Sequence, residues 1–531
     1  MNPLASTKYA PRLFMALAAI AGILFAAGCG SSNSITPPNQ EGFTNASLTG
    51  TYVFSSTGLD SGGVFLAVAG AFAANGSGGT SGITGGTIDV NGFDPGFFST
   101  PITSGGYSVG PDGRGQVALN WNGGTITLDF VLTSSVGGPS TVSTHGLITE
   151  FDGNGTGSGS LDLQATGALT GSYSFGLAGE SSTGTPLAMV GTFNSGAVAA
   201  GVPSNGLVDI NSGGTSLGGL TGLTLTATVT AGSPGTGSLV ASDGTTYNFD
   251  VYMVDPTHLK FIETDSAQIL AGDAFTQQSS IPLGVYAYAM EGLDPSDNPM
   301  ALGGFISSDG TSIISGGLED YNDAGTVNEV TGFGGSFTAF SGGRTELTLN
   351  GIYNGVSGSN VTFAAYPSSG GIELLEIDGG GITGGFTLPQ GSTTALAAQG
   401  YGLNLSASNA GGFEEDDIAQ FMVTSSNTYN GAEDINDEGL TTSDAAFNGT
   451  LTPDTVVAGH GSAASTSGEI NFNYYIAGPS VLILETDNNQ VGVGSFEVQT
   501  STQAAAVARS NFLPVRMKPG AKAKAGWKKK Q

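Results

Sequence analysis

The stretch FIETDSAQILAGDAFTQ, residues 261–277, carries the motif that decides the fold. It contains Glu-x-Asp and, 14 residues after the Glu, a Gln. The same elements at the same spacing occur four times, as Glu150, Asp152 and Gln164; Glu263, Asp265 and Gln277; Glu376, Asp378 and Gln390; and Glu485, Asp487 and Gln499. A motif repeated at a fixed period is the signature of a repeat architecture.

Each copy closes a longer unit with an ordered set of features. An aromatic strand opens the unit, at Tyr52, Tyr173, Tyr286 and Tyr401, which are 121, 113 and 115 residues apart. A G-x-F-like strand and then a D-x-N element follow in the same order, around Phe72, Phe193, Phe305 and Phe421 and at Asp89, Asp209, Asp320 and Asp434. We therefore expect β repeats at 43–165, 166–278, 279–390 and 391–500.

Within a unit the apolar residues alternate with polar ones, and Gly, Asn, Asp or Pro interrupts the pattern at short intervals. This period of two is typical of β-strands. Eight strands are expected in the first unit, near 51–56, 65–73, 85–91, 106–110, 115–120, 125–133, 146–152 and 158–164. The sequence thus predicts an all-β protein of four tandem antiparallel units of about 115 residues, each an eight-stranded barrel or sandwich. One eight-bladed β-propeller, with a blade in each half-unit, is the alternative.

Composition excludes several classes of protein. With 11% charged and 39% hydrophobic residues, the chain is not of the disordered class. All 43 acidic residues lie between positions 41 and 500, and only Arg114, Lys260 and Arg344 oppose them there. Such an acidic body repels phosphate backbones, so no nucleic-acid partner is expected. The segment 501–531 has eight basic residues and no acid, which predicts a solvated tail that binds anionic lipid, cell-wall polymer or the acidic body, or only aids solubility.

The N-terminus has the pattern of an export signal. Lys8 and Arg12 precede an apolar run, residues 13–27, that is short for a spanning helix and ends in small residues directly before Cys29, the single cysteine. This segment resembles a bacterial lipoprotein precursor, with Ala26 where that family most often has Leu. The resemblance implies a signal peptide at 1–28, acylation of Cys29 and a tether at 29–42. Position 30 is Gly rather than the Asp of an inner-membrane retention signal. We therefore expect the protein to be located in the cell envelope, at the outer membrane or the cell surface.

The Glu-x-Asp pairs are the first candidates for chemistry. Residues i and i+2 of a strand share a face, so Glu263 and Asp265, like the other pairs, would lie side by side. Two adjacent carboxylates can bind a metal or act as acid and base. Fourfold repetition instead favours a structural role for Glu150, Asp152, Glu263, Asp265, Glu376, Asp378, Glu485 and Asp487. We expect each Glu to pair across a hairpin with the Gln that follows it.

The D-x-N elements of the third and fourth units resemble the start of a calcium loop. Calcium prefers oxygen ligands clustered on a glycine-bearing turn, which makes six residues candidate ligands: Asp320, Asn322, Asp323, Asp434, Asn436 and Asp437. The spacing of an EF-hand is missing, and Asp and Asn also favour ordinary turns. No cofactor is expected other than calcium.

Signals of catalysis are weak. His145, His258 and His460 have no repeated metal-binding spacing, and the G-x-S-x-G match at 106–110 is followed by a Pro-Asp-Gly turn instead of a helix. We therefore expect a non-enzymatic lipoprotein, held at the membrane by its lipid, whose repeated β scaffold has a structural role or binds a glycan, a cell-wall polymer or a protein. A secreted glycan-active enzyme and a calcium-stabilised adhesion module are the alternatives.

Overall fold

The computed structural model describes residues 42–499, apart from 94–95, 136–141, 196–205, 222, 226–233, 241–244, 266, 410–412 and 467–469. The expected signal peptide, Cys29, the tether as far as residue 41 and the basic tail lie outside the described residues. Within the described part, no helix is long and apolar enough to span a membrane. Helical structure there consists of short 3₁₀ turns such as Asn45–Ser47, and the rest of the regular structure is β-strand.

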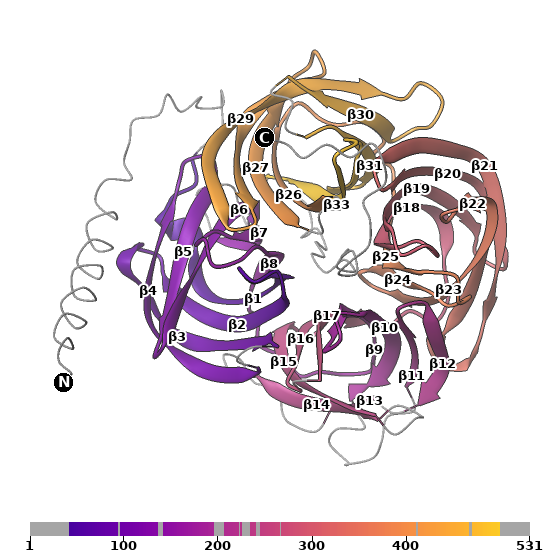
Figure 1. Cartoon of the computed structure of the whole chain (residues 1–531). Coiled ribbons are helices and arrows are strands. Elements are labelled where there is room, and N and C mark those ends of the chain that lie inside the picture. The colour runs from indigo at the N-terminus through magenta and orange to yellow at the C-terminus, as the bar shows by residue number, and fades with distance from the viewer. Residues whose placement is uncertain are drawn as a thin grey trace, which may run out of the picture. The chain divides into compact units, whose positions relative to one another are not determined.

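Unit 1 is a closed eight-stranded antiparallel barrel (Figure 1). Each strand pairs with the next, and β8 returns to pair with β1. The eight strands expected in this unit are confirmed in order: β1 Thr49–Leu59, β2 Phe65–Asn75, β3 Gly79–Gly92, β4 Phe98–Val109, β5 Arg114–Trp121, β6 Gly124–Ser135, β7 Ser143–Glu150 and β8 Ser158–Leu163. Closure leaves no edge strand, which suits a chain with few charged residues to protect an edge.

Units 3 and 4 are closed barrels with the same topology. Unit 3 consists of β18 Leu283–Leu293, β19 Pro299–Asp309, β20 Ile313–Asp323, β21 Thr326–Ala339, β22 Thr345–Tyr353, β23 Ser357–Ser368, β24 Gly371–Glu376 and β25 Ile382–Pro389. Unit 4 consists of β26 Gly400–Asn409, β27 Glu414–Val423, β28 Thr428–Asp437, β29 Leu440–Pro453, β30 His460–Ser465, β31 Phe472–Ala477, β32 Ser480–Glu485 and β33 Gln490–Val498.

Unit 2 is a sheet of nine strands in the order β12-β11-β10-β9-β17-β16-β15-β14-β13. Its edge strands β12 and β13 are separated in the chain only by residue 222, so together they take the place of the fourth strand. The propeller alternative is wrong, because the first strand of each unit pairs with the last strand of the same unit and not of a half-unit. The strands are β9 Ser172–Ser181, β10 Pro186–Asn194, β11 Leu207–Ser212, β12 Thr215–Thr221, β13 Leu223–Leu225, β14 Gly235–Val240, β15 Thr246–Asp255, β16 His258–Glu263 and β17 Gln268–Thr276.

Alternate side chains of each strand fill the lumen of their unit. The aromatic residue that opens a unit stacks there on the Phe of the second strand, with ring centroids 5.9 Å apart for Tyr52 and Phe72 and 5.6 Å apart for Tyr401 and Phe421. In unit 3 the expected partner Phe305 faces outward instead, toward unit 4, and Tyr286 pairs with Ile306. Apart from Phe305, the aromatic residues of these motifs therefore form lumen cores, as expected for alternating strands.

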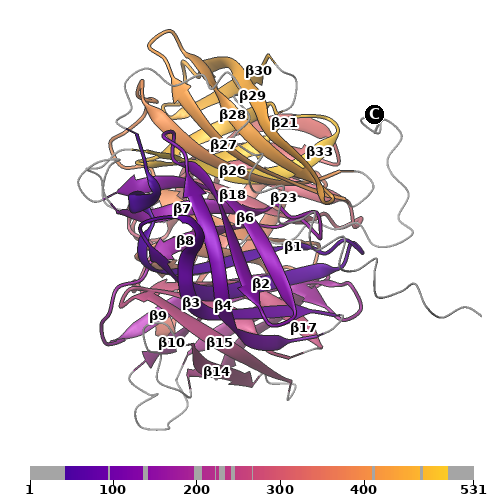
Figure 2. The ribbon, with the colours of Figure 1, turned by 90° about the vertical axis from the view of Figure 1, so that its left-hand side faces the viewer.

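The outward faces of several strands are also buried, because they pack against the next unit. Thirteen buried apolar residues form the cluster between units 3 and 4, whereas only Val131, Leu147 and Ile418 form the one between units 4 and 1. Similar clusters join units 1 and 2 and units 2 and 3. Because the last unit also contacts the first, the four units form a closed cycle of contacts, with unit 1 between units 4 and 2 (Figures 1 and 2).

Candidate functional site

The Asn of each D-x-N element joins its unit to the next one. Its amide nitrogen donates hydrogen bonds to backbone carbonyls at the Glu-x-Asp turn of the neighbour. Asn436 of unit 4 reaches Glu150 O at 2.6 Å and Gly155 O at 2.8 Å of unit 1, which closes the cycle. The other three junctions are Asn91 to Glu263 and Asp265, Asn211 to Glu376 and Gly381, and Asn322 to Glu485, Asp487 and Gln490.

In units 3 and 4 the same Asn also shapes its own hairpin turn. Asn322 Oδ1 accepts a hydrogen bond from Gly325 N at 2.9 Å, and Ala324 and Gly325 both have positive φ, as a two-residue hairpin turn requires. Asn436, Glu438 and Gly439 repeat this arrangement. The segments predicted to bind calcium are therefore hairpin turns at a junction between units.

The four Asp residues predicted as calcium ligands differ in their surroundings. Asp323 Oδ2 accepts a hydrogen bond from Tyr353 at 2.6 Å, and Asp437 ends β28. The other two, Asp320 and Asp434, face the next unit. Calcium binding at these turns stays a prediction.

The Asp of each D-x-N element meets a donor from the next unit. Tyr252, Tyr366 and Tyr475 donate to Asp89, Asp209 and Asp320 at 2.6, 2.5 and 2.6 Å. A basic side chain is added at three of the junctions: Arg344 lies 2.8 Å from Asp209, His460 lies 2.9 Å from Asp320, and Arg114 lies 3.3 Å from Asp434.

The Glu-x-Asp pairs do not lie on one strand face as expected, because each strand ends at the Glu. The Glu stands opposite a lumen residue, as Glu263 does opposite Phe249, and so faces the lumen. The Asp lies in the following turn and accepts a backbone N–H, as Asp265 does from Asn248 at 2.9 Å. Asp152, Asp378 and Asp487 accept in the same way from Thr127, Thr362 and Asn471.

Burial raises the pKa of three of the lumen Glu residues. Burial and then the Asp265 carboxylate raise the pKa of Glu263 to about 9. Burial likewise raises the pKa of Glu376 to about 7 and that of Glu150 well above its ordinary value. The expected Glu–Gln pairing is wrong, because the hairpin turns directly after Asp265 instead of near residue 270, which puts Glu263 and Gln277 at opposite ends of the hairpin.

The repeated Gln residues are instead a second set of bonds between units. Each donates its side-chain amide to a backbone carbonyl of the next unit. Gln164 reaches Met253 O at 2.7 Å, Gln277 reaches Gly342 O at 2.8 Å, Gln390 reaches Ala458 O at 2.7 Å, and Gln499 reaches Asp112 O at 2.9 Å and Leu132 O at 3.0 Å. All three repeated motifs therefore take part in contacts between units.

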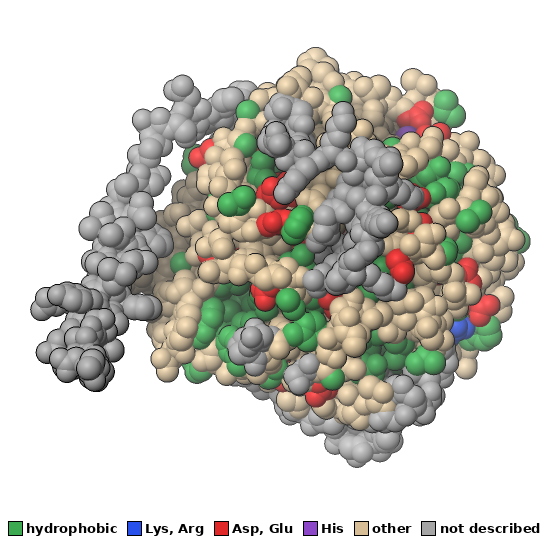
Figure 3. Space-filling model, viewed as in Figure 1, with side chains coloured by type: hydrophobic (Ala, Val, Ile, Leu, Met, Phe, Trp, Pro, Cys, Tyr) green, Lys and Arg blue, Asp and Glu red, His purple; other side chains and the backbone are tan. Residues whose placement is uncertain are grey.

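Basic side chains of the body lie at the same junctions, and among the charged side chains on the face drawn in Figure 3 the acidic ones are more numerous than Lys and Arg. Lys260 of unit 2 is buried, and its Nζ lies 3.3 Å from Asp162 of unit 1 and 3.2 Å from Asp273 of its own unit. His145 extends this network, with Nδ1 2.6 Å from Asp162 and Nε2 3.6 Å from Glu497 of unit 4. The network links units 2, 1 and 4.

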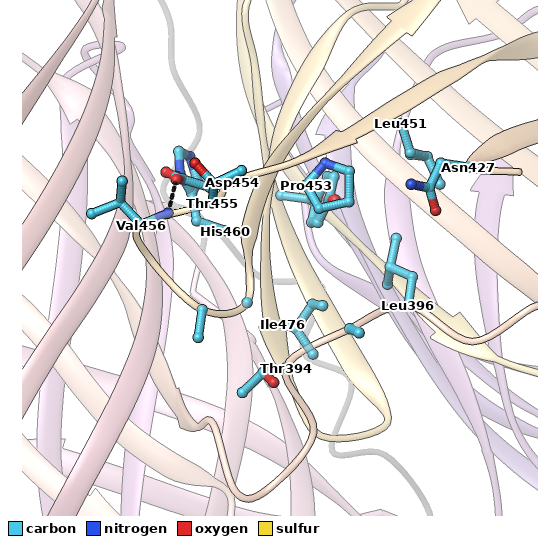
Figure 4. Close-up of a pocket in the computed structure, with 14 residues that line it drawn as sticks. Thr394, Leu396, Asn427, Leu451, Pro453, Asp454, Thr455, Val456, His460 and Ile476 are labelled. Atoms are coloured by element: carbon cyan, nitrogen blue, oxygen red, sulfur yellow. Dashed lines mark hydrogen bonds and ion pairs between the residues drawn. The ribbon is translucent and has the colours of Figure 1, made fainter.

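A pocket of about 280 Å³ lies in unit 4 and is lined by residues of that unit alone, between Thr394 and Ile476. Asp454 and His460 lie together at one end of it, and Leu396, Leu451 and Asn427 lie at the other (Figure 4). Behind the pocket lining, His460 contacts Asp320, and the exposed Glu329 of β21 completes a group of three possible metal ligands.

His460 is held between two carboxylates. Its Nδ1 lies 2.9 Å from Asp454 Oδ2, and its Nε2 lies 2.9 Å from Asp320 Oδ2. Burial lowers the pKa of His460, but the hydrogen bonds with Asp320 and Asp454 outweigh burial, and the pKa is raised. Sequence reasoning dismissed this residue. The dipeptide Gly459–His460 is the sequence signal that could have identified His460. It corresponds to Gly113–Arg114 in unit 1 and Gly343–Arg344 in unit 3. The three Gly residues are equivalent because each adjoins a repeated Gln of the preceding unit.

The lumen of unit 4 contains a second feature that the sequence analysis missed. Asp417 is 1% exposed, and neither of its carboxylate oxygens has a hydrogen-bond partner among the described residues. Burial, followed by Glu415, Glu433 and Glu485, raises its pKa well above the ordinary value. The register of the second strands places the apolar residues Val68, Met189 and Leu302 at the equivalent position in units 1, 2 and 3.

Comparison with protein-family models, curated protein sequences and solved structures finds no match to this chain. The chemistry that these sites support is therefore inferred from their own residues. The repeated polar residues bind one unit to another, whereas His460 with its carboxylates offers metal-binding chemistry beside an open pocket.

Proposed function

We propose that this protein is a non-enzymatic, lipid-anchored component of the cell envelope, whose four units form one scaffold for binding or for structural support. One observation carries the proposal: the Asn junction, made four times in a closed cycle. A chain that devotes its repeated polar residues to joining its own units gains a rigid body with a large outer surface, which suits a scaffold.

The position of the repeated carboxylates also favours a scaffold over a glycan-active enzyme. Hydrolysis of a glycoside needs two carboxyl groups facing the substrate from either side. In each unit the Glu faces the lumen and the Asp accepts backbone hydrogen bonds in a turn, as Asp265 does from Asn248. These groups therefore support folding more readily than catalysis.

Attachment to the membrane rests on the resemblance of the first 29 residues to a lipoprotein precursor. An acyl chain contributes about 0.8 kcal/mol for each buried methylene, so a multiply acylated Cys29 would hold the chain at the membrane without a spanning segment. The ligands that suit this location are a glycan, a cell-wall polymer or another envelope protein, and the basic tail would add affinity for an anionic surface.

The anchor is tested by labelling cells with an acyl-chain analogue. The wild type and the control Ser31→Ala should incorporate the label and fractionate with membranes, whereas Cys29→Ser should do neither. Equal labelling of Cys29→Ser would exclude the anchor.

The binding role is tested with the same purified chain on a glycan array and on isolated cell-wall polymer, with a parallel assay for new reducing ends. We expect the protein to be retained on a glycan or on the polymer and to release no new reducing ends. Turnover that Glu376→Gln abolishes would contradict the scaffold proposal and favour the enzyme.

A further inference from the structure

We propose that Asp320, Glu329 and His460 form a binding site for a divalent transition-metal ion, with Zn²⁺ as the best fit, between units 3 and 4. Each residue offers one ligand atom, and the three atoms all lie within 4.8 Å of one another. Among the described residues this is the only such group of His, Cys, Asp and Glu side chains. Two of the ligands come from unit 3 and one from unit 4, so the ion would join the two units.

The histidine is oriented as a zinc ligand requires. Asp454 Oδ2 lies 2.9 Å from Nδ1, and Asp454 is itself fixed by the backbone N–H of Val456, which donates to Oδ1 at 2.6 Å. A carboxylate that accepts the Nδ1 proton sets the tautomer and directs the lone pair of Nε2 to the metal. The ring also stacks on Tyr475, with centroids 5.7 Å apart. Asp454 is thus a positioning residue.

The donor set favours zinc over calcium or magnesium. An imidazole with two carboxylates suits zinc, which takes His nitrogen and Asp or Glu oxygen and often keeps one position open, while calcium and magnesium prefer oxygen alone. Glu329 is exposed, so an ion has access from its side of the site, whereas the pocket of about 280 Å³ is lined by His460 but not by Asp320 or Glu329. The calcium ligands expected from the sequence share only Asp320 with this set.

Comparison with two equivalent junctions explains why those two are less suited to a metal. Arg344 pairs with Asp209 and Arg114 pairs with Asp434, and a guanidinium cannot lose its proton to become a ligand. His460 makes the same pairing with Asp320, yet it can exchange a proton for a metal ion. Asp320, Glu329 and Asp454 together place three carboxylates around one imidazole, an excess of negative charge that a divalent cation offsets.

Zinc affinity of the full chain tests the proposal. The protein is prepared without a histidine tag and with Cys29→Ser, which removes the only thiol. Calorimetric titration with Zn²⁺ should give one saturable site, and Co²⁺ should give the visible absorption of a low-coordinate complex. A wild type that shows neither would overturn the proposal.

Three variants test the assignment of ligands. Asp454→Asn should weaken zinc binding by about 10–100-fold, as expected for loss of an outer-shell partner, and Glu329→Gln should weaken it at least as much. His460→Arg should abolish binding while preserving the junction, because it recreates the Arg–Asp pairs of Arg114 and Arg344. The matched control is Glu346→Gln, a half-buried Glu beside Arg344, which should leave the affinity unchanged.

Circular dichroism and thermal unfolding show whether each variant is folded. Unchanged zinc affinity in folded His460→Arg or in Glu329→Gln would refute the site. Since Glu329 is exposed on the surface, its variant keeps the test valid even if His460→Arg fails to fold.

Discussion

The junction between units 4 and 1 should be the weakest point of the cycle, and Asn436→Ala should open it. Asn436 is buried and donates to Glu150 O and Gly155 O. Its loss leaves two buried carbonyls without a donor. At about 1–3 kcal/mol for each unsatisfied group, the free energy of unfolding should fall by about 2–6 kcal/mol.

The apolar contacts at this junction cannot compensate. Only three buried apolar residues form its cluster, against thirteen between units 3 and 4. Asn322→Ala, which removes the donor to three carbonyls, is therefore the matched control: it should destabilise the protein, but the interface between units 3 and 4 should stay closed.

Hydrogen exchange measured by mass spectrometry distinguishes the two variants. In Asn436→Ala, peptides from β7 and β27 should lose protection under conditions where the lumen strands of other units remain protected. Asn322→Ala should leave β7 and β27 unchanged. A loss of less than about 1 kcal/mol in Asn436→Ala, or equal opening of both interfaces, would show that the Asn contacts do not hold the cycle together.

Three further changes test the lumen and the junctions. The folded state keeps a proton on Glu263 up to a pKa of about 9, against an ordinary value of 4.5, so it binds more protons than the unfolded state between these values and stability falls as the pH rises. The melting temperature should therefore drop less from pH 5 to pH 9 in Glu263→Gln than in the wild type, and identical slopes would contradict the burial argument. Asp417→Leu, which introduces the residue found at Leu302, should stabilise unit 4 by about 1–3 kcal/mol in denaturant unfolding, and a loss of stability would show that the carboxyl group has a partner. Gln499→Leu should cost about 2–6 kcal/mol, at about 1–3 kcal/mol for each of Asp112 O and Leu132 O that loses this donor, and a silent variant would refute that contact.

The strands could be predicted because their signal is local. Period-two alternation and the spacing of Tyr52, Tyr173, Tyr286 and Tyr401 depend only on which side chains face a lumen. Hairpin register was harder to predict than strand position. The turn lies between Glu263 and Gln268, before the assumed centre near residue 270, and that shift separates Glu263 from Gln277. A change of register moves side chains to the opposite face or end of a hairpin, so one misplaced turn removed the predicted pair.

The junctions could not be predicted from local pattern at all. Asn91 and Glu263 are 172 residues apart in the chain, and nothing in either motif indicates that an amide from one will meet a carbonyl of the other. Repetition did predict a shared structural task for the Glu-x-Asp residues. What it could not indicate is that the task lies between units instead of within each one.

Positions where a unit departs from the repeat are therefore the places to look for activity. A residue present in all four units, such as Asn436 and its counterparts, is explained by the cycle. His460 stands where two of the other junctions have Arg114 and Arg344, and Asp417 stands where the other lumens have apolar residues. Neither departure helps folding: an Arg would pair with Asp320 without regard to pH, and a Leu would pack better than a buried carboxyl group. A substitution that costs stability in one unit only is the expected mark of a site, and both lie in unit 4.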